Sequence, residues 1–214
     1  MIENLDQLRA LYAAPGERAV RKQMRRLDAH AQRFVARSPF CVIASGGGSG
    51  ALLDASPRGG APGFVKLADE GATLFLPDSG GNNRLDTLEN LLADPRASLL
   101  FIIPGMDETL RVNGRARLRD EAACCDLFAE ERQRPKLVIE IAVQEAYLHC
   151  PKAFMRSQLW DPRSWAPRDE MPTLNQMLAD QIGGAVTAES HEQMLARYLA
   201  QLESEQAPSR PRTD

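Results

Sequence analysis

From Pro39 onward the chain consists of short apolar segments separated by turn residues. FCVIAS, GALLDAS, GFVKLA and ATLFLP follow one another with Gly, Pro, Ser and Asp between them, a pattern typical of strands joined by tight turns. Helical patterns interrupt the later strands only at 85–93 and 120–132. Because parallel strands need long crossover connections, these short links favour antiparallel pairing. The sequence therefore predicts a closed or nearly closed antiparallel barrel of six or seven strands.

The later strands have distinct apolar patterns. ASLLFIIP is continuously apolar, so we expect it in the middle of the sheet. ETLRVNGRARL alternates, with Leu110, Val112, Ala116 and Leu118 on one face and Thr109, Arg111, Asn113, Arg115 and Arg117 on the other. One face of this strand should therefore be buried, and the other should be polar.

Helical patterns flank the barrel on both sides. Apolar residues at helical spacing predict two helices within 3–37, separated at Pro15 and Gly16, and further helices follow Pro151. The mainly β (α+β) chain should therefore comprise a helical segment (1–37), a barrel domain (38–150), a helical extension (151–206) and a disordered tail (207–214).

Composition restricts the class of protein. The net charge of −3 argues against a protein that coats nucleic acid. No apolar run approaches the roughly 20 residues of a membrane span, and the acidic start MIENLDQLRALY differs from a signal peptide. The four cysteines show no metal or disulfide spacing, which indicates reduced thiols. We expect a cytoplasmic protein that has neither membrane nor nucleic acid as a partner.

Two polar clusters are candidate anion sites. Ser56, Arg58 and Lys66 flank the Gly/Pro turn in DASPRGGAPGFVKL, although Lys66 could instead extend to solvent from an edge strand. In PDSGGNNRLDTLENLL, the residues Asn82, Asn83 and Arg84 precede a helix whose first N–H groups and dipole favour phosphate. The alternative is that Asn83 caps the helix and Arg84 is solvated.

The polar face of ETLRVNGRARL forms a third cluster. A solvated surface, a dimer contact or, with Arg115 and Arg117, a nucleic-acid surface would each account for it. Taken with Arg58, Lys66 and Arg84 on neighbouring strands, Arg111 favours a shared anion site, because arginine binds phosphate in bidentate fashion.

No arrangement of side chains points to hydrolytic or metal chemistry. His149 beside Cys150 resembles half a metal site, but no second ligand pair accompanies it, and we expect no metal. No nucleophile and base pair is apparent, so the catalytic residues are not identified. Redox chemistry would therefore depend on a bound cofactor.

Long strings of the sequence resemble a known family. FVKLADEGATLFLPDSGGNNRLDTLENLLADPRASLLFIIPG followed by ETLRVNGRARL resembles the pyridoxamine 5'-phosphate oxidase-like FMN-binding split-barrel proteins, and HCPKAFMRSQLWDP resembles one bacterial subgroup of them. The resemblance covers residues 5–183. It implies a six-stranded antiparallel split barrel and a homodimer with FMN at the subunit interface.

The resemblance also implies cofactor-binding residues. Lys66, Asn83, Arg84 and Thr87 correspond to the phosphate region, Leu76 and Pro77 to the strand along the flavin ring, and Thr109 to a glutamine that reaches FMN. The partner subunit would close the site. The full expected set is Ser56, Arg58, Lys66, Leu76, Pro77, Asn82, Asn83, Arg84, Thr87, Thr109, Arg111, Lys152, Arg156 and Trp160.

The chain also departs from the family pattern. Gly60 stands where the subgroup has an aspartate, and the basic substrate-binding C-terminus of the true oxidase is absent from SRPRTD. Oxidation of pyridoxamine phosphate is therefore not expected. The expected function is that of an FMN-dependent oxidoreductase with an unknown small-molecule substrate; the alternatives are a flavin-binding protein or sensor without turnover, and a barrel that binds haem or a deazaflavin.

Overall fold

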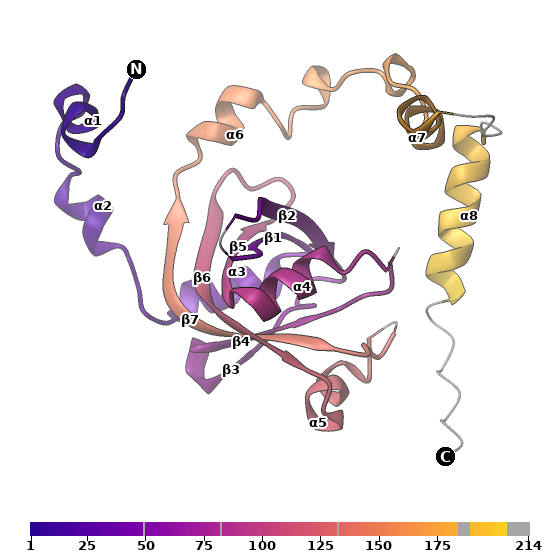
Figure 1. Cartoon of the computed structure of the whole chain (residues 1–214), viewed down its shortest axis with the longest axis horizontal. Coiled ribbons are helices and arrows are strands. Elements are labelled where there is room, and N and C mark those ends of the chain that lie inside the picture. Colours follow the sequence, from indigo (N-terminus) through magenta and orange to yellow (C-terminus); the bar gives the residue numbers. More distant parts are fainter. Residues whose placement is uncertain (49, 82, 132, 184–188, 205–214) are drawn as a thin grey trace.

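The computed structural model describes residues 1–48, 50–81, 83–131, 133–183 and 189–204. It places a β-barrel at the centre, with the helices Leu5–Leu11 and Glu17–Arg21 on one side and the helices Leu174–Ile182 and His191–Ser204 on the other (Figure 1). The expected tail, 207–214, lies outside the described residues.

Seven strands make up the sheet, all of them paired in antiparallel fashion in the order β2-β1-β5-β6-β7-β4-β3. Their bounds are β1 Phe40–Gly46, β2 Leu53–Gly59, β3 Lys66–Ala68, β4 Thr73–Pro77, β5 Arg96–Ile102, β6 Thr109–Arg119 and β7 Val138–His149. The interior position of β5 is confirmed. The six strands that the family resemblance implied are corrected to seven, whereas the sequence pattern itself predicted six or seven; Lys66–Ala68 forms a short edge strand beside β4.

The long β6–β7 hairpin joins two halves of the sheet (Figure 1). β5 pairs with residues 109–115 of β6, whereas β4 pairs with residues 138–142 of β7. A bulge between these halves lies opposite Asn113 and Gly114 and leaves Gln144 without a partner in the register. Bulges bend a strand. Here the bulge also shifts the alternation of buried residues in β7: Ile139 and Ile141 are buried before it, and Ala146 is buried after it. The barrel is not closed, because the edge strands β2 and β3 do not pair with each other, and the helices beside this antiparallel sheet make the fold α+β.

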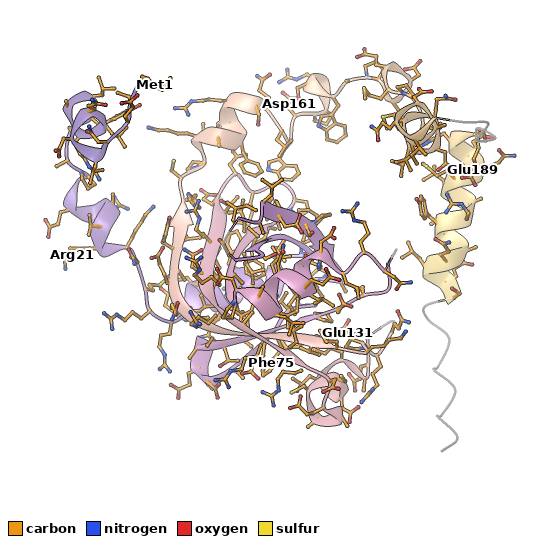
Figure 2. The ribbon with its side chains drawn as sticks, viewed as in Figure 1. Met1, Arg21, Phe75, Glu131, Asp161 and Glu189 are labelled. Atoms are coloured by element: carbon orange, nitrogen blue, oxygen red, sulfur yellow. The ribbon has the colours of Figure 1, made fainter. Side chains whose placement is uncertain are left out.

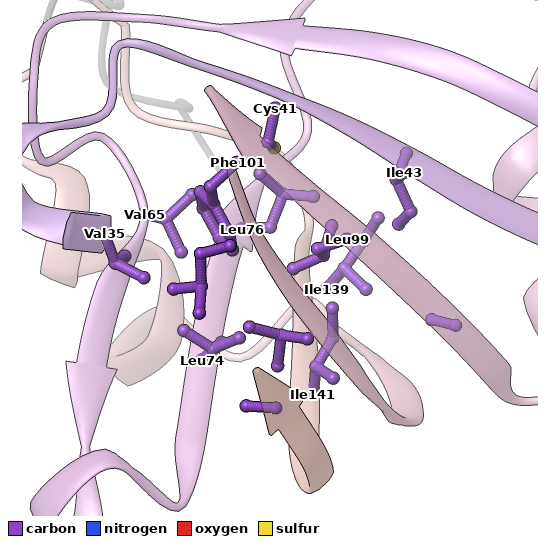
Figure 3. Close-up of a cluster of buried hydrophobic side chains, with 14 of the residues drawn as sticks. Val35, Cys41, Ile43, Val65, Leu74, Leu76, Leu99, Phe101, Ile139 and Ile141 are labelled. Atoms are coloured by element: carbon purple, nitrogen blue, oxygen red, sulfur yellow. The ribbon is translucent and has the colours of Figure 1, made fainter. Parts of the chain in front are cut away.

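The core lies between the two halves of the sheet (Figure 3). Inward side chains from five strands meet there, and they include Ile43, Leu74, Leu76, Leu99, Phe101, Ile139 and Ile141. The alternation expected in β6 is confirmed, since Leu110, Val112 and Ala116 are buried whereas Arg115 and Arg117 are exposed. Full burial of such side chains stabilises a fold by about 1.5–3 kcal/mol each.

Three helices precede the barrel, α1 (Leu5–Leu11), α2 (Glu17–Arg21) and α3 (Ala29–Arg37), rather than the two expected. The break between α2 and α3 arises where Met24 forms a two-way backbone bridge with Ala146 of β7, at 2.8 Å in both directions. α3 then packs Ala31, Phe34 and Val35 into the core. By contrast, α1 and α2 bury no residue.

The short helix α4 (Asp86–Ala93) packs against β1, β2 and β6. Leu91 and Thr87 are its buried residues, and Asn90 Nδ2 donates to Ser45 Oγ at 3.3 Å. The helix was expected to begin at Leu85, but Leu85 has left-handed backbone (φ 59°) and is the N-cap without a side-chain capping bond. α4 therefore begins after a strained turn.

The remaining elements lie after β6 and β7. The link before β7 contains α5 (Ala122–Cys125) and the 3-10 helix η2 (Asp126–Phe128), in place of the single helix expected over 120–132. The C-terminal arm comprises α6 (Lys152–Ser157), α7 (Leu174–Ile182) and α8 (His191–Ser204). Figure 2 shows Asp161 and Glu189 on this arm, Met1 and Arg21 on the N-terminal helices, and Phe75 and Glu131 at the barrel.

Gly114 should be indispensable at the bulge. A Cβ on this residue would lie 2.3 Å from the backbone oxygen of Ala142, and a backbone atom cannot move aside as a flexible side chain can. We predict that Gly114→Ala lowers the free energy of unfolding by about 1–3 kcal/mol, measured by urea denaturation. Gly16→Ala is the control, because no atom lies within 4 Å of a Cβ there. Equal effects of the two substitutions would contradict this account of the bulge.

Candidate functional site

A polar cavity of about 530 Å³ lies where the end of β2, the turn after β4, the start of α4 and the link before β7 meet. Ligand pockets in proteins span roughly 300–1,000 Å³, so this volume suits a small organic molecule. The sequence places the two sides of the cavity far apart: residues 56–59, 78–81 and 83–88 on one side, and residues 133–136 on the other.

A hydrogen-bonded network of β2 and α4 side chains forms one wall. Arg58 Nη2 donates to Thr87 Oγ1 at 3.2 Å, and Arg58 Nη1 donates to the carbonyl oxygen of Pro57 at 2.9 Å. Thr87 Oγ1 in turn donates to Ser56 Oγ at 3.2 Å. Thr87 is only 3% exposed, so its hydroxyl is fixed in place. The network therefore holds the Arg58 guanidinium in one orientation at the cavity wall.

The cavity is predominantly basic. Its described lining contains Arg58, Arg84, Arg134 and Lys136, against two carboxylates, Asp78 and Asp86. Some of these charges are paired, since Arg84 Nε donates to Asp86 Oδ2 at 2.8 Å and Arg134 Nε donates to Asp126 Oδ1 at 2.6 Å. Burial raises the pKa of Asp78, while the charge of Arg58 lowers it in part. The arrangement favours an anionic guest.

The turn before α4 is strained. Asn83 and Leu85 both have positive φ, at 61° and 59°. Asparagine tolerates this region, but for leucine it costs of order 1–3 kcal/mol and persists only where the surroundings enforce it. The turn brings the start of α4 to the cavity, where the first N–H groups of a helix have no partner within the helix.

A second cavity, about 500 Å³, adjoins the polar one. The two share residues of β2, of the turn after β4 and of the link before β7, namely Gly59, Asp78, Ser79, Gln133 and Pro135. The second has a more apolar lining that includes Phe64, Pro77 and Phe128. Glu131, on its wall, is paired with Lys66, whose Nζ lies 5.7 Å from the Phe128 ring centroid. Together the cavities offer a basic end and an apolar end.

The structure brings together part of the expected site. Ser56, Arg58, Asn83, Arg84 and Thr87 line the polar cavity, and Pro77 lines the apolar one. Leu76 is fully buried in the core. Asn82 lies outside the described residues.

The other expected residues line neither cavity within one chain. Lys66 bonds to Glu131, as described above. Thr109 is buried at the start of β6, and Arg111 Nη1 donates to Tyr147 Oη at 2.9 Å. Lys152 and Arg156 lie on α6, and Trp160 Nε1 donates to the carbonyl oxygen of Met106 at 2.9 Å.

Sequence reasoning missed the wall from the link before β7. Gln133, Arg134 and Lys136 lie directly before a strand, in the segment QRPK, and two basic residues around a proline at a strand entry were the available signal. Asp78 was also missed. Nothing in the sequence pattern placed this link opposite α4, because that proximity depends on the β4–β7 pairing.

Among the described residues, no group of three or more His, Cys, Asp or Glu side chains could hold a metal ion. None of the helices in the described part of the chain has the length and apolar character needed to cross a bilayer.

The fold defines a split-barrel protein, and comparisons with known proteins agree with this class. The profile of the family described as pyridoxamine 5'-phosphate oxidase matches residues 27–150, more than half of the chain. The chain therefore belongs to the pyridoxamine 5'-phosphate oxidase family, whose members typically bind a flavin. A search of the curated proteins finds no match.

Several solved structures are similar to the barrel at low identity. A HupZ variant from Group A Streptococcus is 15% identical, with a TM-score of 0.47, over 57% of this chain and 98% of that one. A Lactobacillus delbrueckii protein named as a pyridoxamine 5'-phosphate oxidase is 12% identical (TM-score 0.45; 58% and 95%). A NimC/NimA family protein from Clostridium acetobutylicum is 13% identical (TM-score 0.44; 57% and 87%). These similarities are too low to bear on activity.

Proposed function

We propose that this protein binds FMN, with the phosphate in the polar cavity and the isoalloxazine ring toward the apolar one. The observation that carries the proposal is the Ser56–Thr87–Arg58 network in the wall of a cavity with excess basic charge. Membership of a family whose members typically bind a flavin supports the choice of ligand.

The residues of the polar end match the chemistry of a phosphate. Arg58 offers a planar, preoriented fork, and charge-assisted hydrogen bonds of this kind are roughly twice as strong as neutral ones. Ser56 and Thr87 add hydroxyl groups, and Arg84 adds positive charge at the start of α4. Lys136 faces the same cavity, and within the described residues it has no ion pair. These groups would bind and orient the phosphate.

The apolar end suits a planar aromatic ring. Phe64, Pro77 and Phe128 would pack against it and exclude water from that side. The Glu131 carboxylate on this wall is already neutralised by its ion pair with Lys66. The chain's contribution would therefore be positioning and desolvation of the ring.

On this basis we propose an oxidoreductase with an unidentified small-molecule substrate. Bound FMN supplies hydride or electron transfer, which the side chains of the cavities do not provide on their own. All four cysteines are free thiols, which supports a reducing compartment such as the cytoplasm.

We also propose that the protein is a homodimer. On β1 and β5 the core-facing residues alternate with outward apolar residues, so both faces are apolar; Phe40, Val42, Leu100 and Ile102 point outward. An antiparallel sheet with one wet face normally carries polar residues there. A second copy of this chain, covering this face, would remove the apolar surface from water.

FMN binding should depend on the phosphate cradle. We predict that Arg58→Gln and Arg84→Gln each weaken FMN binding about tenfold or more, because a bond from a charged donor contributes about 1.5–3 kcal/mol. Binding is measured by quenching of flavin fluorescence. Riboflavin, which lacks the phosphate, should bind equally well to all variants.

The control for the cradle experiment is Arg96→Gln. Arg96 pairs with an aspartate two residues away, as Arg84 does, but lies outside both cavities. It should leave FMN affinity unchanged. Absence of FMN binding by the intact protein, or equal losses of FMN and riboflavin affinity in the cradle variants, would overturn the proposal.

Turnover separates an oxidoreductase from a flavin-binding protein or sensor. One observation favours the flavin-binding protein or sensor without turnover. Of the two carboxylates that line the apolar cavity, Glu131 is already paired with Lys66. We predict that NADH or NADPH bleaches the visible absorbance of the reconstituted protein in a stopped-flow experiment. A second experiment reduces the bound flavin with dithionite and follows its reoxidation by quinones. If NADH and NADPH do not reduce the flavin and quinones do not reoxidise it, the sensor is the better description.

The mass of the protein in solution tests the proposed homodimer. Light scattering after size exclusion should give twice the chain mass of 23.6 kDa, and Val42→Asp should shift the protein toward monomer, because it places a charge in the apolar face. Leu92→Asp is the control, since Leu92 is 74% exposed on α4. A monomeric wild-type protein would contradict this arrangement.

A further inference from the structure

A second basic cluster lies on the outward face of the β6–β7 hairpin, away from both cavities. It consists of Lys22, Arg111, Tyr147 and His149, called here the Tyr147 cluster. The ammonium of Lys22 lies 5.1 Å from the Tyr147 ring centroid and the guanidinium carbon of Arg111 lies 5.5 Å from it. The rings of Tyr147 and His149 are 5.1 Å apart. Two cations and two aromatic rings therefore share one small surface.

The backbone fixes the cluster. Arg111 and Tyr147 are register partners across β6 and β7. Lys22 comes from the segment after α2, which the bridge between Met24 and Ala146 ties to β7, and its Nζ donates to the carbonyl oxygen of Leu148 at 2.7 Å. A segment distant in sequence is thus held in place beside the hairpin.

Neither cation has a carboxylate partner. Among the ion pairs of the described residues, none includes Lys22 or Arg111. Within the described part of the chain, Arg111 donates a hydrogen bond to the phenolic oxygen of Tyr147. The nearby carboxylate of Glu145 is engaged elsewhere, because it accepts from Gln23 Nε2 at 2.8 Å and from Asn113 Nδ2 at 3.1 Å. Within the described residues, both cations beside the Tyr147 ring therefore lack a carboxylate partner.

His149 adds a buried polar atom without a partner. Its Nε2 is inaccessible to solvent and makes no hydrogen bond within the described structure. Burial, then the charges of Arg111 and Lys22, lower the pKa of His149, which keeps the ring neutral at pH 7. Buried polar groups usually have a partner, so His149 Nε2 is available to a hydrogen-bonding group of a ligand.

We propose that the Tyr147 cluster is a binding site for the carboxylate or phosphate group of a small ligand. Arg111 presents a fork already oriented by Tyr147, Lys22 supplies a point charge, and His149 offers one more hydrogen bond. The anion would supply the negative partner that both cations lack within the described residues. The site needs neither FMN nor the polar cavity, so it stands independently of the proposed function.

The ring signals of the histidines test this proposal. The chain has three histidines, and His149→Asn assigns the His149 signal in a carbon-proton correlation spectrum. Inorganic phosphate and acetate are titrated separately into the full-length protein, with and without one equivalent of FMN. We expect a saturable shift of the His149 signal with at least one of them, and the stronger of the two identifies the ligand group.

Variants of the two cations show whether they form the site. Arg111→Gln and Lys22→Gln should each weaken binding of the anion about tenfold or more. Arg117→Gln is the control, because Arg117 is an exposed arginine on the same strand, and it should leave the affinity unchanged. Thermal unfolding of each variant confirms that it is folded.

Several outcomes would overturn the proposal. One is a His149 signal that drifts linearly with both anions and does not saturate, and another is a shift of the same size in the Arg111→Gln and Lys22→Gln proteins. FMN binding is measured separately, by flavin fluorescence. Failure of FMN to bind would contradict the proposed function but not the anion site at the Tyr147 cluster.

Discussion

The β6–β7 hairpin is the constraint on which the rest of the structure depends. One half of its length pairs with β5 and the other half with β4, and the bulge at Asn113 and Gly114 separates the two. Because one hairpin serves both halves of the sheet, the ends of β2 and β4 approach each other with α4 beside them. The link before β7 closes the remaining side. The cavities are therefore a consequence of how the barrel is split.

Within that frame, the hydrogen bond from Arg58 to Thr87 joins the sheet to the helix. It connects edge strand β2 to α4 and turns a flexible side chain into a fixed donor. The strained backbone at Leu85 has a related effect, since it sets where α4 begins. Positive charge, an oriented guanidinium and a helix start thus meet at one place, whereas apolar side chains line the adjoining cavity. This polarity is what an elongated ligand with one charged end requires.

Much of the fold could be predicted from sequence because strand alternation is a local signal. The apolar run of β5 and the alternating faces of β6 placed both strands correctly. The strand expected in GFVKLA is also present, but pairing with β4 limits it to Lys66–Ala68, and these bounds could not be read from the sequence. The break between α2 and α3 likewise depends on a bridge from Met24 to a strand more than a hundred residues away.

The site was predictable where its residues are close in sequence. Asn83, Arg84 and Thr87 lie in one turn and helix, and β2 supplies Ser56 and Arg58. The opposite wall, with Arg134 and Lys136, could not be placed, since its position depends on long-range pairing of β4 and β7. Arg111 was grouped with the other basic residues on charge alone. Its position on β6 instead directs its side chain toward Tyr147 and away from the cavity.

The central claim is that the polar cavity holds the phosphate of a flavin, and a crystal structure of the protein with FMN tests it most directly. The account predicts phosphate density within hydrogen-bond distance of Arg58 and the hydroxyl groups of Ser56 and Thr87, with the flavin ring extending toward Phe64 and Phe128. FMN bound elsewhere on the molecule, or in the reverse orientation with its ring among the basic residues, would contradict it.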